Sequence, residues 1–151
     1  MNAKPVIAAL SDFPVITTLP IQWGDQDAFG HVNSTVPIRW FESSRVEYLL
    51  EIGMNVEAPE SGIGPILASI SCHYRLQLTY PDTVHIGARV AKIGRSSIDI
   101  QHAVFSEAQQ AVAAEGDSVV VAYAYASQRP ARVPNAIRAA IDRLQGGLGP
   151  S

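Results

Sequence analysis

The chain has 151 residues, of which 47% are hydrophobic and 17% charged, and its formal net charge is −3. This composition indicates one folded domain, because such a chain can bury a core of its own and is too apolar to stay disordered. The slight negative charge and the lack of a lysine- or arginine-rich run give no indication of binding to nucleic acid or to an anionic membrane. We therefore expect no nucleic-acid partner and no membrane partner.

The single cysteine, Cys72, excludes an intramolecular disulfide and a zinc site made of several cysteines. It lies in an apolar run, so we expect it to pack as a small buried side chain. The apolar run near the N-terminus is short and is broken by an acid and a proline, which does not resemble a secretory signal. No apolar run reaches the length of a transmembrane helix, and we expect a cytoplasmic protein.

The first predicted elements are a lead-in and a strand. Residues 1–14 are expected to form a flexible lead-in, and residues 15–23 read as a strand. Pro20 lies within this strand and has no N–H to donate to a neighbour. It therefore fits an edge strand or a bulge better than a central strand.

A long helix is predicted from about residue 35 to residue 52. Its apolar residues recur at spacings of three and four, as one buried helical face requires: Ile38, Phe41, Tyr48, Leu49 and Ile52. Pro37 is tolerated only in the first turn of a helix, so the helix should begin near residues 34–36. A side chain among residues 33–35 is then expected to cap it.

The second half of the chain is rich in β-branched and aromatic residues with partial alternation, which is typical of strands. Four strands are predicted, over residues 66–80, 83–94, 96–107 and 110–127. A short C-terminal helix is predicted over residues 134–144, and residues 146–151 are expected to form a tail.

One strand, one long helix and then four strands predict an antiparallel α+β fold rather than alternating βαβ units. We expect a single α+β domain over residues 15–145, with an antiparallel sheet of about five strands and one long helix. One helix covers only one face of such a sheet. The uncovered face and the sheet edges therefore favour a dimer.

The segment between the first strand and the helix, IQWGDQDAFGHVNS over residues 21–34, concentrates polar residues and glycines. It is not a calcium loop, because the fifth position counted from Asp25 is Phe29 and the twelfth is Val36. The four histidines of the chain lie on separate predicted elements without helical ligand spacing, so no metal site is expected. A phosphate-binding loop would need more glycines, and the two aspartates would repel the phosphate.

Once these three kinds of site are rejected, the remaining interpretation of the segment is carboxylate chemistry at the start of a helix. The first N–H groups of a helix have no partner within the helix, and the positive end of the helix dipole lies there. N–H groups near Asn33 and Ser34 could stabilise the oxyanion that develops on a carbonyl. A nearby aspartate could attack the same carbonyl or activate a water molecule. These parts make a minimal hydrolase site.

The same residues resemble the signature of the 4-hydroxybenzoyl-CoA thioesterase family, which are acyl-CoA thioesterases of the hotdog fold. The signature is matched by Trp23, Asp25, Asp27, Gly30, His31, Val32, Asn33, Phe41, Glu42 and Arg45. The resemblance implies a sheet wrapped around one long central helix. It also implies a homodimer, often a homotetramer, that hydrolyses acyl-CoA to a free acid and coenzyme A without a metal or another cofactor.

The resemblance also implies roles for single residues. The second aspartate, Asp27, takes the catalytic role as nucleophile or general base, and Asp25 takes a structural role. The amide that polarises the carbonyl falls at Ser34, where many members of the family carry asparagine or tyrosine. Gly30 is expected to let the backbone and the substrate come close.

Three further side chains, His31, Asn33 and Glu42, have two interpretations each. His31 either orients the loop or assists the chemistry, and Asn33 either caps the helix or contacts the substrate. Glu42 and Arg45 lie one helical turn apart and are predicted to pair. In the resembling enzymes the position of Glu42 can face the acyl pocket, so it is also a candidate for substrate binding.

Coenzyme A carries phosphates, and the resemblance implies contacts with them near a predicted strand turn. This turn offers cations and hydroxyls for substrate binding: Lys92, Arg95, Ser96 and Ser97. Arg129 and Arg132 are further candidates of the same kind, and Trp23 is a candidate contact beside the loop.

Two other functions remain open. The hydratases of this fold have an aspartate and a histidine separated by four residues. Here five residues separate Asp25 from His31 and three separate Asp27 from His31, so the pattern does not match. A protein that binds acyl-CoA without turnover is the second alternative, and the intact Asp27, Gly30 and Asn33 speak against it.

Overall fold

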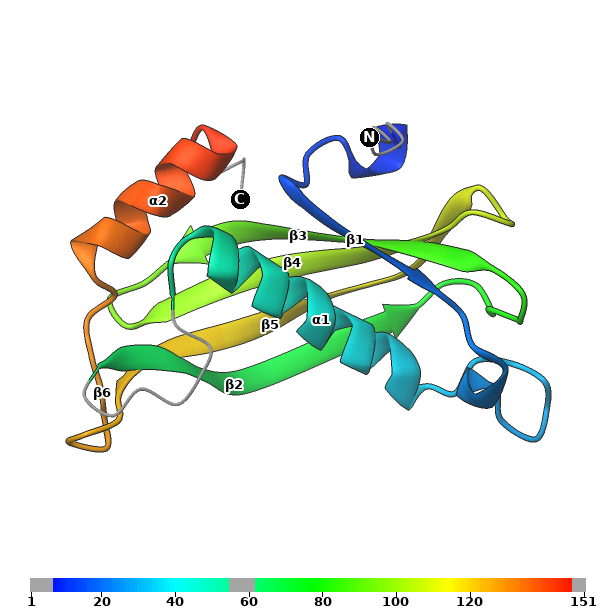
Figure 1. The fold of residues 1–151 in the computed structure, drawn as a ribbon, viewed down its shortest axis with the longest axis horizontal. Helices are drawn as coiled ribbons and strands as arrows, with labels where there is room; N and C mark the ends of the chain where they lie inside the picture. Colours follow the sequence, from blue (N-terminus) through cyan, green and yellow to red (C-terminus); the bar gives the residue numbers. More distant parts are fainter. Residues whose placement is uncertain (1–6, 55–61, 148–151) are drawn as a thin grey trace.

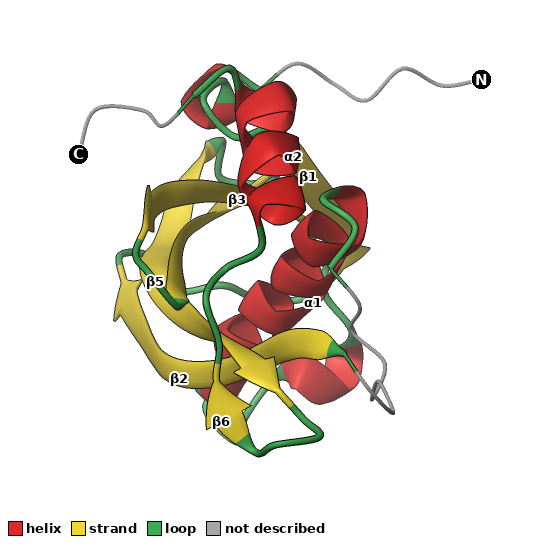
Figure 2. Cartoon of the chain, turned by 90° about the vertical axis from the view of Figure 1, so that its left-hand side faces the viewer, coloured by secondary structure: helices red, strands yellow, loops and turns green. Residues whose placement is uncertain are grey.

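The computed structural model describes residues 7–54 and 62–147, and in it one long helix lies in the hollow of a curled antiparallel sheet (Figures 1 and 2). The strands are β1 (Val15–Pro20), β2 (Ile63–Tyr74), β3 (Thr83–Ile93), β4 (Ser97–Ser106), β5 (Ala111–Ala124) and β6 (Arg129–Pro130). The α-helices are α1 (Thr35–Glu51) and α2 (Asn135–Gln145), and the 3-10 helices are η1 (Ala8–Leu10) and η2 (Trp23–Asp25). None of the described helices is long and apolar enough to cross a membrane.

The sheet has the strand order β1-β3-β4-β5-β2, all neighbours are antiparallel, and the two-residue β6 pairs with β5. The predicted α+β architecture with a central helix is confirmed. Pro20 closes β1, which is an edge strand, so its missing N–H removes no bond from the sheet interior. The first strand ends at Pro20 rather than residue 23, because residues 23–25 form η2.

Helix α1 begins where Pro37 predicts, but it buries a wider face than the spacing of its apolar residues indicates. Its buried residues follow in neighbouring pairs four apart: Val36 and Pro37, Trp40 and Phe41, Ser44 and Arg45, Tyr48 and Leu49. Ile38, which the spacing places on the buried face, is 36% exposed. The sheet curls around the helix (Figure 2). Two neighbouring stripes of α1 are therefore buried, and polar Ser44 and Arg45 lie inside with the apolar residues.

The described part of the expected lead-in is packed against the sheet. Leu10 of η1 is buried together with Ala103 and Phe105 of β4. Residues 7–13 therefore cover part of the sheet face opposite α1, rather than forming a loose extension. Residues 1–6 of the lead-in and residues 148–151 of the expected tail lie outside the described residues.

A buried histidine joins α1 to the sheet. The Nδ1 atom of His102 lies 2.9 Å from the Ser44 hydroxyl, and its Nε2 atom lies 2.7 Å from the Ser118 hydroxyl. Its ring stacks on Phe41 with 4.7 Å between the ring centroids. Burial, with a smaller contribution from the positive charge of Arg45, lowers the pKa of His102 from 6.5 to about 3.

The lowered pKa of His102 predicts that the folded protein loses stability in acid. The folded protein keeps His102 neutral down to about pH 3, whereas the unfolded chain binds a proton near its ordinary pKa of 6.5. Between these values the unfolded state binds more protons, so the free energy of unfolding falls as the pH is lowered, by up to about 1.4 kcal/mol per pH unit. The free energy of unfolding, measured with urea between pH 7 and pH 4, should fall with this slope in the wild type. The slope should be smaller in His102→Gln. His73→Gln, which changes an exposed histidine, is the control and should keep the wild-type slope. A wild-type slope in His102→Gln would show that His102 does not cause the loss of stability in acid.

Candidate active site

The loop between β1 and α1 is held at its base by Asp25. This residue is only 8% exposed, and one oxygen of its carboxylate accepts the Gln22 N–H at 2.8 Å. The other oxygen accepts a hydrogen bond from the Arg39 guanidinium at 3.1 Å. The Asp25 carbonyl also accepts the Asn33 N–H at 2.9 Å, which closes the loop. These contacts support the structural role that the resemblance implies for Asp25.

Asp27 stands at the exposed turn of this loop. Its Oδ1 atom accepts the Phe29 N–H at 2.8 Å, and its carbonyl accepts the Gly30 N–H at 3.1 Å. Gly30 has a φ of +79°, a conformation that favours glycine and lets the chain turn back. The Asp27 N–H then donates to the His31 carbonyl at 2.8 Å. Because only Oδ1 has a donor among the described residues, Oδ2 is available to a substrate or to a water molecule.

The start of α1 is capped by Asn33. Its Oδ1 atom accepts the Thr35 N–H at 3.0 Å and the Thr35 hydroxyl at 2.9 Å, and its carbonyl accepts the Val36 N–H at 2.9 Å. The Ser34 side chain makes no capping bond, and its N–H has no acceptor among the described residues. Ser34 therefore presents a free N–H at the positive end of the helix.

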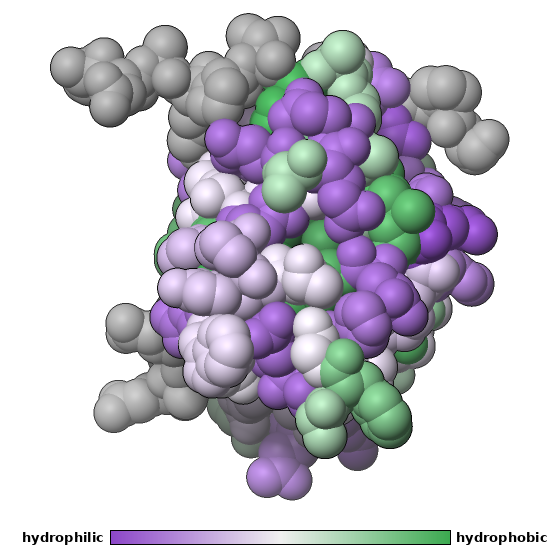
Figure 3. All heavy atoms as spheres, turned by 90° about the vertical axis from the view of Figure 1, so that its right-hand side faces the viewer, coloured by the Kyte–Doolittle hydropathy of each residue, from purple (hydrophilic) through white to green (hydrophobic). Residues whose placement is uncertain are grey.

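A cavity of about 430 Å³ lies at this end of α1. It brings together four of the expected site residues, Asp27, His31, Asn33 and Ser34. The Nδ1 atom of His31 is buried and has no hydrogen-bond partner among the described residues. Figure 3 views this end of the molecule, where apolar side chains lie among hydrophilic ones.

Another part of the cavity wall comes from the end of β2, the segment that follows it and the start of β5. Its residues were not expected from the sequence: Tyr74, Arg75, Leu76, Gln77, Leu78, Ala113 and Ala114. The Tyr74 hydroxyl donates to the Ser34 carbonyl, so the end of β2 is tied directly to the start of α1. These residues are remote from the loop in sequence, and no local pattern marks them.

Cys72 lies two residues before Tyr74 and is half-buried rather than fully buried. Burial raises the pKa of its thiol, and a hydrogen bond with Tyr74 lowers it to a smaller extent. A thiol with a raised pKa is a poor nucleophile. The raised pKa therefore does not favour Cys72 as a nucleophile.

Other expected site residues lie apart from the cavity. Trp23 is 73% exposed and packs edge-on against Tyr80, with 5.6 Å between the ring centroids, and it does not line the cavity. Glu42 is exposed on α1.

The predicted ion pair between Glu42 and Arg45 is wrong, because no such pair occurs among the ion pairs of the described residues. The Nη1 atom of Arg45 is buried and has no hydrogen-bond partner among these residues. Burial lowers the pKa of Arg45, against a smaller opposite effect of Glu42.

The expected phosphate contacts lie at the far end of the sheet. Lys92, Arg95, Ser96 and Ser97 surround the turn between β3 and β4. The other end of β3 adjoins the loop, since the Ile21 N–H donates to the Asp82 carbonyl at 2.9 Å. A strand of this length spans about 35 Å. Within one chain, these residues are therefore too far from Asp27 to share a small ligand with it.

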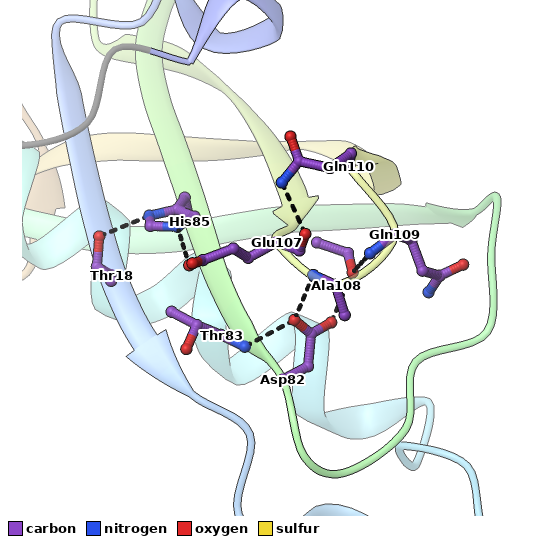
Figure 4. A network of polar contacts seen from close by, with 9 residues as sticks. Thr18, Asp82, Thr83, His85, Glu107, Ala108, Gln109 and Gln110 are labelled. Carbon is purple, nitrogen blue, oxygen red and sulfur yellow. Dashed lines mark hydrogen bonds and ion pairs between the residues drawn. The ribbon is translucent and has the colours of Figure 1, made fainter.

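A second polar cluster joins the strands beside the loop (Figure 4). His85 lies between the Thr18 hydroxyl, 2.8 Å from its Nδ1, and a Glu107 carboxylate oxygen, 3.0 Å from its Nε2. Asp82 accepts the Ala108 N–H at 2.9 Å and thereby ties the turn after β4 to the start of β3. Because both ring nitrogens of His85 are engaged, the cluster holds β1, β3 and the turn after β4 together and leaves no free nitrogen for catalysis.

Known proteins resemble the chain in both sequence and fold. The family model described as "Thioesterase-like superfamily" matches residues 21–141. A thioesterase from Thermus thermophilus, solved in complex with coenzyme A and zinc, is 30% identical, with a TM-score of 0.78 over 91% of this chain and 98% of that chain. In the part of our chain that the structure describes, no group of three or more His, Cys, Asp or Glu residues is arranged to hold a metal ion.

Two curated proteins are more distant relatives. YsmA of Bacillus subtilis, itself uncharacterized, is 24% identical over 92 residues, which is 61% of this chain. The chloroplastic acyl-acyl carrier protein thioesterase ATL3 of Arabidopsis thaliana is 27% identical over 113 residues, which is 74% of this chain. The chain spans 61% of the length of YsmA and 59% of the length of the Arabidopsis enzyme.

Proposed function

Because the chain belongs to the thioesterase-like superfamily, we propose that it hydrolyses the thioester of an acyl-CoA to a free acid and coenzyme A. The observation that carries this proposal is one cavity lined by both Asp27 and Ser34, the residue whose N–H has no acceptor among the described residues. A thioester carbonyl placed there would meet a hydrogen-bond donor and a carboxylate at once. The coenzyme A complex of the Thermus relative supports this choice of substrate.

The proposed reaction begins with the thioester carbonyl oxygen on the Ser34 N–H. As a nucleophile adds to the carbonyl carbon, negative charge grows on that oxygen, and the N–H and the helix dipole stabilise it. The nucleophile is either the Asp27 carboxylate, which forms an anhydride that water then hydrolyses, or a water molecule that gives a proton to Asp27. The carbon–sulfur bond breaks, and the coenzyme A thiolate leaves and takes up a proton.

Two neighbouring side chains take supporting roles in this proposal. Asn33 serves as the helix cap, because its Oδ1 atom is already engaged by Thr35. His31 lines the same cavity, so we assign its ring to contact with the substrate or with the attacking water. Its Nδ1 atom is buried, so this contact falls to another part of the ring. No metal ion or other cofactor takes part in the proposed reaction.

We also propose that the working unit contains at least two copies of the chain. β2 is an edge strand of twelve residues, and it exposes Ile66 and Leu67 by 41% and 44%. A long edge strand with exposed apolar side chains tends to pair with another chain. Antiparallel pairing of two β2 strands would bring the far end of one sheet toward the cavity of the other copy. This arrangement joins the two parts of the site that one chain keeps apart, and it fits a homodimer or a homotetramer of two such pairs.

The phosphates of coenzyme A would then meet a cluster of arginines from the second copy. A hollow of about 430 Å³ at that far end is lined by Arg95, Arg132 and Arg138. Arg138 is committed to the backbone, with hydrogen bonds to the Gly94 carbonyl at 2.7 Å and the Arg95 carbonyl at 3.2 Å. Arg95 and Arg132 are exposed, and their guanidinium groups can bind phosphate.

Removal of these two arginines should weaken the binding of coenzyme A without slowing the chemistry. In the double variant Arg95→Ala and Arg132→Ala, we expect KM for an acyl-CoA to rise about 10-fold with kcat unchanged, the loss of about one charge-assisted hydrogen bond. The same acyl group on N-acetylcysteamine, which has no phosphates, should show no change in KM. Arg143→Ala, an exposed arginine of α2, is the matched control. An unchanged KM for acyl-CoA would remove these arginines from the proposed site.

The release of free thiol from a panel of thioesters tests the proposed function. The panel should include aromatic, short branched and medium straight-chain acyl-CoAs, and also acyl-acyl carrier protein, the substrate type in the name of the Arabidopsis relative. We expect thiol release from at least one acyl-CoA. Tight binding without release would indicate an acyl-CoA-binding protein instead, and conversion of an enoyl-CoA without free thiol would indicate a hydratase.

A further inference from the structure

Tyr74 connects the edge strand of the sheet to Ser34, the residue whose N–H would polarise the substrate carbonyl. It is at the end of β2 and lines the cavity. Its hydroxyl donates to the carbonyl of Ser34, the residue whose N–H is free. No other side-chain hydrogen bond to the Ser34 backbone occurs among the described residues.

The Ser34 N–H belongs to the peptide group between Asn33 and Ser34, and the peptide group that follows Ser34 restrains its orientation from the other side. On one side, the Asn33 carbonyl is fixed by the Val36 N–H. On the other side, the Thr35 N–H is fixed by the Asn33 side chain, and the Ser34 carbonyl of the same peptide group is fixed by Tyr74. Without the tyrosine hydroxyl, the second peptide group keeps its N–H contact and loses its side-chain contact on the carbonyl. The start of a helix has few internal hydrogen bonds and frays easily, so each such contact restricts it.

We propose that Tyr74 is a positioning residue for thioester hydrolysis, whose hydroxyl holds the Ser34–Thr35 peptide group so that the Ser34 N–H points at the substrate carbonyl. This inference rests on the proposed function, in which that N–H stabilises the transition state. A hydrogen bond to a developing oxyanion is sensitive to direction, and small displacements reduce its effect. The hydroxyl itself acts on the protein backbone and not on the substrate.

The state of the tyrosine hydroxyl suits this role. Burial, and to a smaller extent the neighbouring Cys72, raises the pKa of Tyr74 above its ordinary value of 10.0. The hydroxyl therefore keeps its proton throughout the neutral range and remains a donor. The pH dependence of hydrolysis should accordingly contain no contribution from Tyr74.

The kinetic test compares Tyr74→Phe with Tyr125→Phe. Phenylalanine keeps the ring that lines the cavity and removes only the hydroxyl. The Tyr125 hydroxyl makes the same kind of bond, to the Pro65 carbonyl at 2.7 Å, and does not line the cavity, so this variant is a matched control. We expect Tyr74→Phe to lower kcat by about 5- to 10-fold, the value of one hydrogen bond, with KM and the shape of the pH profile unchanged. Tyr125→Phe should keep the wild-type kcat.

Two kinetic results would overturn the proposal. A wild-type kcat in Tyr74→Phe would show that the hydroxyl does not position the site. Loss of an alkaline limb from the pH profile of kcat would show that Tyr74 transfers a proton to the substrate instead.

Amide hydrogen exchange tests the same idea without turnover. The Thr35 amide should exchange several-fold faster in Tyr74→Phe than in the wild type, and Tyr125→Phe should not change it. If the wild type cleaves no thioester, the proposed function fails, and this comparison still decides whether Tyr74 holds the start of α1. Equal exchange in all three proteins would refute the positioning role.

Discussion

Asparagine in place of Asp27 should lower kcat for thioester hydrolysis by about 100-fold or more. The substitution keeps the shape of the side chain, and its amide oxygen can still accept the Phe29 N–H that now reaches Oδ1 at 2.8 Å. It removes the negative charge, and with it the ability to attack a carbonyl or to take a proton from water. The expected loss is the size of a general-base contribution. Steady-state thiol release measures it directly.

The controls for this variant separate chemistry from folding. Asp117→Asn changes an exposed aspartate on β5, away from the cavity, and should keep the wild-type kcat. Thermal unfolding of Asp27→Asn should be close to that of the wild type, because the exposed turn keeps its hydrogen bonds. If Asp27→Asn hydrolyses thioesters as fast as the wild type, another group performs the reaction.

Alanine in place of Gly116 should lower the free energy of unfolding by about 3 kcal/mol or more, or prevent folding. Gly116 lies in β5 opposite Cys72 of β2, and a Cβ atom there would lie 1.9 Å from the Ser71 carbonyl oxygen and 2.9 Å from the Phe41 ring. The Ser71 carbonyl belongs to the backbone of β2 and cannot move aside as the end of a flexible side chain can. Strands β2 and β5 must therefore separate to make room for the added Cβ atom. This exceeds the usual cost of overpacking, which is about 1–3 kcal/mol.

Urea unfolding of Gly116→Ala beside Gly24→Ala measures this effect. A Cβ atom at Gly24 would meet nothing within 4 Å, so that variant should lose little stability. Because β2 carries Tyr74 to the cavity, a folded Gly116→Ala protein should also lose activity. Equal stability of the two variants would contradict the close approach of β2 and β5.

The sequence was sufficient to predict the order of the main elements and to single out the polar loop before α1 as the candidate site. Pro37 placed the start of α1, because a proline fits only the first turn of a helix. The two aspartates could be given different roles only through the family resemblance, and the contacts of Asp25 support its structural role. Asp27, His31, Asn33 and Ser34 lie within one short segment, so a local motif could place them together.

Contacts between distant segments could not be predicted in this way. Tyr74 reaches the cavity because β2 pairs with β5 in one particular register, and register depends on packing across the whole sheet. The exposure of Ile38 follows from the curl of the sheet around α1, which the spacing of apolar residues does not encode. The separation of the turn after β3 from Asp27 likewise appears only once the strand directions are known.

The most direct test of the proposed hydrolysis measures free thiol and free acid formed from a panel of aromatic and aliphatic acyl-CoAs. Wild type and Asp27→Asn should be compared side by side, each with and without a metal chelator. We expect equal amounts of thiol and acid from the wild type, and no effect of the chelator. The rate of Asp27→Asn should be lower by about 100-fold or more. Equal rates from the two proteins, or no thiol from any acyl-CoA with binding retained, would contradict this mechanism.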